Sequence, residues 1–399
     1  MPLRRRALPD YGPPRGAAEW RALYEALSIA FEIPPKDARR WVRRAGRGCF
    51  RVLRSDGEAA GGLALYPMGH WFGGRSVPAL GVAGVAVLPH LRARGVASRL
   101  MREAVLEMAR TGACLSTLYP ATHTVYRGAG YEIAGHWEFH TIPVSSLDAR
   151  EREPAVRPAR PRDRRAIRAL YGEFARRVPG MVDRSEYFWW RARGRGERTV
   201  RTWVVEGGGG PEGYFVLEQE KRTEFPGPGY DLWMPDHAYR TPAAGLRMLS
   251  FLAAHRSIAG DLRWPGGPAD PLLALLAEPF AKPKKHGRWM LRVADLAGAV
   301  ARRGFPAGLE ASVDLEVEDD LVARNRGRWT IRVADGRGRA VRGGAGRVRV
   351  GARGFAPVYT GYQSPFDLRA AGLLAGPDGD LERLAAIFAG PAPWMRDGF

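Results

Sequence analysis

Residues near position 90 combine a strand, a turn and a helix in an order that is typical of anion binding. The β-like run 82–87 is followed by the turn Arg92-Ala-Arg-Gly-Val-Ala97, and the residues after Gly95 repeat apolar side chains at helical spacing. The first turn of a helix leaves backbone N–H groups unpaired and carries the positive end of the helix dipole. Gly95 lets the backbone approach a ligand closely, and Ala97 adds little bulk. This stretch therefore predicts a pocket for a pyrophosphate.

The elements that position this pocket are predicted from periodicity and turn residues. In residues 1–150, a helix over 17–31 precedes short strands and then the helix after Gly95, which is an α/β layer arrangement. The strands are expected at 49–53, 62–66, 76–80, 82–87 and 114–118. A charged, proline-spaced stretch over 151–162 leads into a second part with the same order of elements. That part has strands expected at 202–205 and 213–217 and a helix over 243–255, which we interpret as a faint structural duplication.

The composition shifts again around 282–287, and the last part of the chain is predicted to be α+β. Helices are expected over 295–303 and after Asp380, and strands at 313–317, 329–333, 346–350 and 355–360. The sequence therefore predicts three domains, at residues 1–150, 151–287 and 288–399.

Two motifs in the first part resemble a known family. The stretch from Gly84 to Met101 resembles the acyl-CoA-binding motif of the GNAT superfamily of N-acetyltransferases, and Val125-Tyr-Arg-Gly-Ala-Gly-Tyr131 is similar to that family's Y-x-x-x-G-[FY] element. The whole chain resembles the enhanced intracellular survival (Eis) family, with tandem GNAT-like domains followed by a sterol carrier protein-like domain. This resemblance implies an acetyl-CoA co-substrate and a homohexamer. One acetyl-CoA per chain is expected, because the second repeat lacks R-x-x-G-x-A and carries Pro242 in the corresponding loop.

The resemblance also assigns roles to individual residues. It implies that the backbone of Val85, Ala86 and Val87 pairs with the pantetheine arm, and that Ala121 and Thr122 line the CoA channel. It assigns the pyrophosphate to the turn and helix start, which are Arg92, Ala93, Arg94, Gly95, Val96, Ala97 and Ser98. Tyr126 would protonate the leaving CoA thiolate as general acid. The alternative for Tyr126 is a packed aromatic whose hydroxyl only finds a hydrogen-bond partner.

The C-terminal residue has a role in the same resemblance. In the Eis family the α-carboxylate of the last residue is the general base, and this chain ends Pro393-Trp-Met-Arg-Asp-Gly-Phe399. Acyl transfer to an amine requires a group that takes the proton of the amine. A solvated terminal carboxyl group has a pKa of about 3.5, and burial would raise that pKa toward the range of an efficient base. The alternative role of Phe399 is a hydrophobic plug that secures the tail.

The acceptor is left open by the sequence. Family members acetylate aminoglycosides, whereas a protein lysine or a polyamine is the alternative acceptor. A lipid- or nucleic-acid-binding protein with a vestigial GNAT domain is the alternative outside enzymes. Acidic residues that the family often carries are replaced here by Thr122 and Gly398, and the net charge is +20, from 62 Lys and Arg against 42 Asp and Glu. A polycationic substrate would need local carboxylates that these motifs lack.

Composition limits the remaining possibilities. The basic residues are spread along the chain rather than gathered on one element with aromatics, so no nucleic-acid partner is predicted. No run approaches 18 apolar residues, which predicts no membrane partner. Cys49 and Cys114 suit a reducing compartment, so we expect a cytoplasmic protein. His136 and His140 lack a third ligand, and no metal site is predicted.

Overall fold

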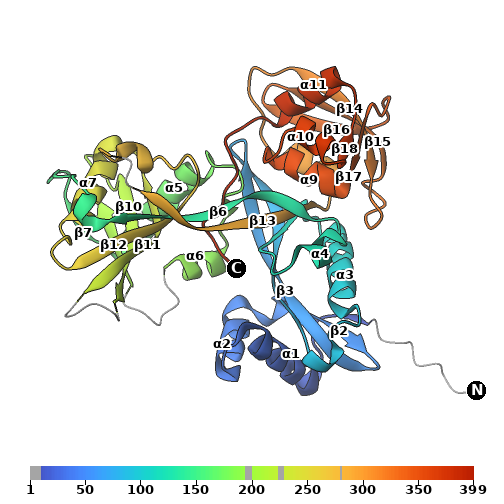
Figure 1. The fold of residues 1–399 in the computed structure, drawn as a ribbon, viewed down its shortest axis with the longest axis horizontal. Helices are drawn as coiled ribbons and strands as arrows, with labels where there is room; N and C mark the ends of the chain where they lie inside the picture. The colour runs from blue at the N-terminus through green and yellow to red at the C-terminus, as the bar shows by residue number, and fades with distance from the viewer. Residues whose placement is uncertain (1–9, 194–199, 223–228, 279–280) are drawn as a thin grey trace, which may run out of the picture.

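The computed structural model describes residues 10–193, 200–222, 229–278 and 281–399. We call the three predicted parts of the chain the first unit (1–150), the second unit (151–287) and the third unit (288–399). Figure 1 shows them as three lobes, with the C-terminus near the point where they meet. The predicted combination of α/β units followed by an α+β unit is confirmed.

A 13-stranded sheet runs through the first and second units, in the order β1-β2-β3-β4-β5-β13-β6-β12-β11-β10-β9-β7, with β8 paired to β3. Its strands are β1 Tyr11–Gly12, β2 Phe50–Ser55, β3 Glu58–Phe72, β4 Arg75–Val87, β5 Leu115–Leu118, β6 Glu132–Pro143, β7 Val156–Pro158, β8 Val182–Asp183, β9 Val200–Val205, β10 Gly213–Lys221, β11 Tyr230–Tyr239, β12 Ala259–Gly266 and β13 Lys282–Val293. The helices of these units are α1 Gly16–Phe31, α2 Pro35–Ala45, α3 Val96–Arg110, α4 His123–Arg127, α5 Arg164–Ala175, α6 Glu186–Ala192 and α7 Pro242–Ala253.

Strand β13 joins the two units into one sheet. Its last four residues pair with β5 of the first unit, and most of its length pairs with β6. The far end of β6 pairs in turn with β12 of the second unit. The predicted boundary at 287 falls inside β13, because this strand ends the second unit and completes the sheet of the first. The division into three domains stays a prediction.

The third unit contains a five-stranded sheet in the order β16-β15-β14-β17-β18. Its strands are β14 Ala311–Glu318, β15 Gly327–Ala334, β16 Arg337–Arg342, β17 Val348–Gly351 and β18 Leu374–Ala375. Its helices are α8 Leu296–Arg302, α9 Ala352–Thr360, α10 Pro365–Ala370 and α11 Asp378–Phe388. After α11 the chain leaves this unit and runs as a tail toward the centre of the molecule (Figure 1).

Three local predictions differ from the structure. The strand predicted at 355–360 is helix α9, because residues 354–360 are all buried and an apolar run that is buried on every side carries no helical period. Helix α2 begins directly at Pro35, in a stretch where no element was predicted, and proline at the first helical position is preorganised for a helix. The two strands predicted at 76–80 and 82–87 form the single strand β4.

No helix among the described residues is both long enough and apolar enough to cross a membrane. Within the same residues, no group of three or more His, Cys, Asp or Glu side chains is placed to hold a metal ion.

Candidate active site

Strand β4 loses its neighbour on one edge where the predicted pantetheine residues lie. β5 pairs with β4 only from Ala79 to Val82. On the other edge, β3 pairs with β4 as far as Val87, with a bulge at Gly84, whose φ is +61°. The edge of Val85, Ala86 and Val87 that faces away from β3 therefore has no strand partner among the described residues. A free strand edge offers N–H and C=O groups to an extended chain such as a pantetheine arm.

The turn after β4 has two left-handed residues directly before a helix. Ala93 and Gly95 both have left-handed backbone conformations, with φ of +60° and +75°. Helix α3 starts at Val96, and no side chain caps its N-terminus. Alternating left- and right-handed residues before a helix turn successive N–H groups toward one point, which favours an anion.

The predicted turn residues are therefore accessible to a ligand. The side chains of Arg92 and Arg94 are exposed, as are Ala93, Gly95 and Ser98, whereas Val96 and Ala97 are half-buried. The pyrophosphate pocket at this turn stays a prediction.

Helix α4 carries the remaining predicted residues of this half of the site. Ala121 and Thr122 are exposed just before the helix, and Thr122 occupies its N-cap position. Tyr126 is buried, with its ring edge-to-face against Tyr131 at 6.5 Å. Burial raises the pKa of Tyr126, so its hydroxyl keeps its proton at neutral pH. A protonated hydroxyl is the form that a general acid requires.

The C-terminal tail enters the first unit from the third. His136 of β6 donates its backbone N–H to the carbonyl of Pro393 at 2.9 Å and accepts from the N–H of Met395 at 3.2 Å. The ring of Phe399 then lies against Tyr119 at 5.5 Å and Phe188 at 5.6 Å. These contacts fix the direction in which the last residues leave β6.

Phe399 also touches strand β4 near the end of its pairing with β5. A Cβ on Gly81 would lie 2.8 Å from the Phe399 ring, so glycine is needed at this close approach. Gly81 pairs with Thr117, one residue before the last β4–β5 pair. The terminal residue is therefore placed where the two strands separate.

A buried cluster of four charged side chains holds the tail. Arg184 Nη1 donates to Asp236 Oδ2 at 2.7 Å, and Arg184 Nε donates to Asp397 Oδ1 at 2.9 Å. Arg396 Nη1 completes the cluster by donating to Asp236 Oδ1 at 3.0 Å. The four side chains are between 0 and 5% exposed, and their formal charges cancel. A buried charge without its partner is costly, so the cluster ties Arg396 and Asp397 to the second unit.

Two tyrosines and an arginine extend this anchor. The hydroxyl of Tyr214 donates to Asp236 at 2.9 Å, and Arg184 lies 3.8 Å from the centre of the Tyr171 ring. Arg191 of α6 donates to the carbonyl of Gly398 at 2.7 Å. Burial raises the pKa of Asp397, whereas the guanidinium of Arg184 and its neighbours lower the pKa of Asp236. The two carboxylates therefore differ in how readily they take a proton.

A cavity of about 640 Å³ opens beside the terminal residue. Its lining is mostly aromatic and comes from the first and second units and the tail. The lining residues are Phe31, Ile33, Asp37, Arg40, Trp41, Tyr119, Trp137, Tyr187, Trp190, Arg191, Gly398 and Phe399. The charged side chains of the lining are two arginines and one aspartate, and the α-carboxylate of Phe399 brings the formal charge to zero.

The structure brings some of the predicted residues together and not others. Val85, Ala86 and Val87 lead directly into the turn 92–98, and Phe399 lies on the same strand near Gly81. Tyr126 does not line the aromatic cavity, and no hydrogen bond or ring contact joins it to Phe399 among the described residues. The roles of the predicted site residues stay predictions.

Sequence reasoning missed the residues that place the tail and line the cavity. Arg184 and Arg191 are near neighbours in sequence, but Asp236 lies 52 residues after Arg184 and Asp397 lies 213 residues after it, and none of them belongs to a motif. The aromatic run Tyr187-Phe-Trp-Trp190 was the available signal, since four consecutive aromatics exceed what one face of a helix can bury. The adjacent Arg396 and Asp397 were a second signal, because a charged pair near an apolar chain end needs partners if the end is buried.

Comparisons with known proteins bear on the fold and the family of the chain. Two family models, both described as an acetyltransferase (GNAT) domain, match residues 14–134 and 180–293, and a sterol carrier protein domain model matches residues 296–396. An uncharacterized N-acetyltransferase of Streptomyces griseus is 27% identical over 274 residues, which are 62% of this chain and 64% of that relative's length. The chain thus spans less than two thirds of this curated relative.

Two solved structures align with nearly the whole chain. Eis1 from Mycobacterium abscessus has a TM-score of 0.78 at 21% identity, covers 98% of this chain and is covered over its full length, which shows a shared fold. A GCN5-related N-acetyltransferase from Anabaena variabilis has a TM-score of 0.92 at 32% identity, with 98% of this chain and 99% of that chain covered. At that identity and coverage, the chain belongs to the GCN5-related N-acetyltransferases.

Proposed function

We propose that the protein transfers the acetyl group of acetyl-CoA to a primary amine. The observation that carries this proposal is that three features follow one another along β4 and the turn after it: the half-buried C-terminal residue packed against Gly81, the free edge of β4, and the uncapped N-terminus of α3. The free edge suits the pantetheine arm, the turn suits the pyrophosphate, and the chain end supplies a carboxylate beside an otherwise aromatic cavity.

The transfer is direct in this proposal. The amine nitrogen attacks the carbonyl carbon of the thioester, so that a C–N bond forms and the C–S bond breaks. The terminal carboxylate of Phe399 takes the proton that the nitrogen loses, and Tyr126 gives its hydroxyl proton to the thiolate of CoA. Both groups then regain their starting protonation states by exchange with water.

The lining of the cavity bears on the acceptor. An aminoglycoside is the acceptor that the family resemblance favours, with a protein lysine or a polyamine as alternatives. Aromatic faces hold one ammonium group well through cation–π contacts. Asp37 is paired with Arg40 at 3.0 Å, and Arg191 adds a second positive charge. The charge balance therefore favours an amine with an apolar body and one positive charge over a polycation.

A thiol-release assay over a panel of amines tests the reaction and the acceptor together. We expect the release of CoA to depend on the amine and to be fastest with an arylalkyl amine, slower with kanamycin and slower still with spermidine. Deleting Phe399 should abolish turnover while leaving acetyl-CoA binding, measured by calorimetry, within about threefold. Tyr126→Phe should lower kcat by about 10²-fold or more, the usual contribution of a general acid.

The alternatives give different results in the same experiments. A vestigial domain that binds lipid or nucleic acid would show no heat of binding with acetyl-CoA. Full turnover without Phe399 would refute the base assignment, and full turnover of the Tyr126→Phe protein would refute the acid assignment. Sedimentation tests the proposed homohexamer, and the cytoplasmic location stays a prediction.

A further inference from the structure

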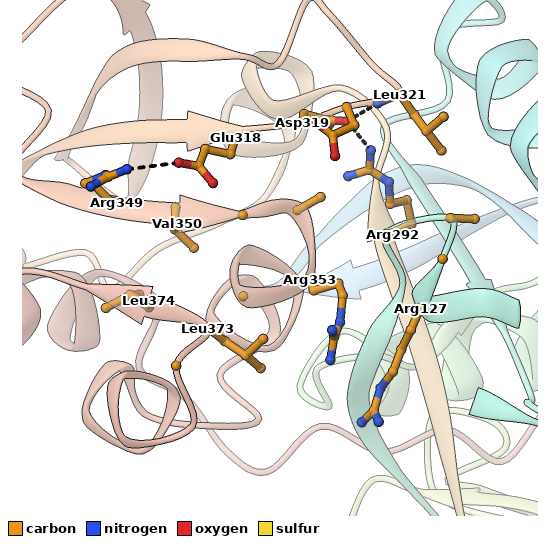
Figure 2. A pocket seen from close by; sticks show the side chains of 18 of the residues that line it. Arg127, Arg292, Glu318, Asp319, Leu321, Arg349, Val350, Arg353, Leu373 and Leu374 are labelled. Carbon is orange, nitrogen blue, oxygen red and sulfur yellow. Dashed lines mark hydrogen bonds and ion pairs between the residues drawn. The ribbon is translucent and has the colours of Figure 1, made fainter. Parts of the chain in front are cut away.

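A second cavity, of about 720 Å³, lies between the first and third units (Figure 2). One wall consists of Arg102 of α3, Arg127 at the end of α4 and the turn 128–130 that follows it. The other wall consists of the ends of β14, β17 and β18 and the beginning of α9. None of the residues assigned to the acetyl transfer lines this cavity, so the proposed function does not explain it.

Arginine is the commonest side chain of the cavity. Six arginines line it, against three carboxylates, which are Glu318, Asp319 and Asp320. The arginines are Arg102, Arg127, Arg292, Arg349, Arg353 and Arg369. Some of this charge is neutralised, since Arg349 pairs with Glu318 at 3.3 Å and Arg292 pairs with Asp319 at 2.6 Å, as Figure 2 shows. Arg369 is also paired, with Asp378 at 2.6 Å.

The junction between the two units keeps an excess positive charge. Arg127 of the first unit and Arg353 of the third both donate to the buried carboxylate of Glu132, at 2.7 and 2.6 Å. The single negative charge of Glu132 therefore balances only one of these two guanidinium groups. In addition, no hydrogen bond or ion pair of Arg102 is found among the described residues. These side chains leave the cavity with unneutralised positive charge.

Arg292 leaves a buried donor without a partner. The residue is 1% exposed, and its Nε has no hydrogen-bond partner among the described residues. A buried polar group without a partner costs free energy, and such groups are rare in native structures. Its guanidinium lies beneath Gly130, where an added Cβ would meet Nε at 2.8 Å.

The N-terminus of α9 faces the same cavity. The helix has nine residues, its N-cap is Gly351, and no side chain caps it. Gly351, Ala352, Arg353 and Gly354 all line the cavity. The unpaired N–H groups of the first turn and the helix dipole favour a negative charge there. Guanidinium groups and helix N-termini both bind oxyanions in proteins.

We propose that this cavity binds a small molecule that carries an oxyanion group, either a phosphate or a carboxylate. Leu321, Val350, Leu373 and Leu374 line the same space, so the ligand combines its anionic group with an apolar body. Because the cavity is shared by two units, such a ligand would connect the third unit, which delivers the tail, to the first unit.

Calorimetry with three matched probes tests the proposal on the full-length protein. Phenyl phosphate and benzoate carry the two oxyanions on the same apolar body, and benzamide is the neutral counterpart of benzoate. We expect at least one of the two anions to bind and benzamide not to bind. Binding of phenyl phosphate alone identifies a phosphate ligand, and binding of benzoate identifies a carboxylate ligand.

Two variants locate the binding in the cavity. Arg102→Gln and Arg353→Gln should each weaken the anion at least threefold. Arg110→Gln removes the same charge from the other end of α3, outside the cavity lining, and should leave the affinity unchanged. Gly95→Asp disturbs the proposed coenzyme turn and should also leave it unchanged, which separates this site from the acetyl-CoA site.

The opposite results overturn the proposal. Equal affinities of Arg102→Gln and Arg110→Gln for the anion would place the anion outside this cavity. A loss of affinity seen only in Gly95→Asp would also place it outside this cavity. No binding of either anion, or equal binding of benzamide, would refute an oxyanion site. The melting temperature of each variant shows whether Arg353→Gln remains folded, and Arg102→Gln keeps the test valid where it does not.

Discussion

Asp397→Asn tests whether the buried charge cluster positions the terminal carboxylate. The substitution keeps the shape of the side chain and removes one of the two negative charges that balance Arg184 and Arg396. Removing one partner of a buried ion pair costs about 3–5 kcal/mol. The amide oxygen of Asn can still accept one hydrogen bond from Arg184, so we expect the lower end, about 3 kcal/mol.

The lost free energy weakens the docking of the C-terminal tail and does not affect the coenzyme turn. A change of about 3 kcal/mol corresponds to about 150-fold in a docking equilibrium. Other contacts of the tail remain, since Trp394 and Met395 are buried and the Phe399 ring packs on Tyr119 and Phe188. We therefore expect kcat to fall by about 10- to 150-fold, and the KM for acetyl-CoA to stay within about twofold.

The control is Asp163→Asn, which breaks a comparable ion pair away from the tail. Asp163 is 5% exposed and bonds Arg157 at 2.6 Å in the second unit. This variant should lower the melting temperature without lowering kcat. A folded Asp397→Asn protein with full kcat would refute the idea that the cluster positions the base. Equal losses of kcat in both variants would show that the effect is general destabilisation.

Two further predictions concern the coenzyme turn and a buried histidine. Gly95→Asp places a negative charge at the N-terminus of α3 and should raise the KM for acetyl-CoA about three- to tenfold. The control is Gly112→Asp, just beyond the other end of α3, where φ is +78° and the space is open. This control should leave the KM for acetyl-CoA unchanged. Burial lowers the pKa of His70 from 6.5 to about 4, while its Nδ1 donates to the carbonyl of Gly180 at 2.8 Å. The unfolded chain therefore binds the extra proton between these pH values, and stability should fall by about 2 kcal/mol from pH 7 to pH 5. Unfolding in denaturant at both pH values should show a smaller fall in His70→Gln, and an equal fall in both proteins would contradict this origin.

Local features of the fold could be predicted because neighbouring residues determine them. The run from β4 through Gly95 into α3 is specified by consecutive residues, and the structure follows it closely. The insertion of β13 between β5 and β6 could not be predicted, because strand pairing across about 150 residues leaves no local periodicity. Helix α9 was predicted as a strand because its burial on all sides removes the amphipathic pattern that indicates a helix.

The site divides in the same way. The turn 92–98 is a local motif, whereas the anchor of the tail is built from Arg184 and Asp236 of the second unit and Arg396 and Asp397 near the chain end. Each of these residues is ordinary by itself, and only the folded chain brings them together. Family resemblance supplied the expectation for Phe399, and the structure places its ring against Gly81 of β4.

The order of the strands along the chain predicts which fragments can fold and bind acetyl-CoA by themselves. The sheet of the first unit needs β13, which pairs with both β5 and β6, so a fragment of residues 1–150 lacks a central strand. An unpaired strand edge in the middle of a sheet invites aggregation. A fragment of residues 1–293 keeps β13, the turn 92–98 and the free edge of β4, but lacks the third unit and the tail.

We expect the fragment 1–293 to bind acetyl-CoA by calorimetry and to release no CoA with any amine, because the terminal carboxylate is missing. The fragment 1–150 should be insoluble or should fail to bind acetyl-CoA. Turnover by the longer fragment would show that the proton of the amine has another acceptor. Tight binding of acetyl-CoA by the shorter fragment would show that β13 is dispensable for the donor site, and would remove the structural reason for joining the first and second units in one chain.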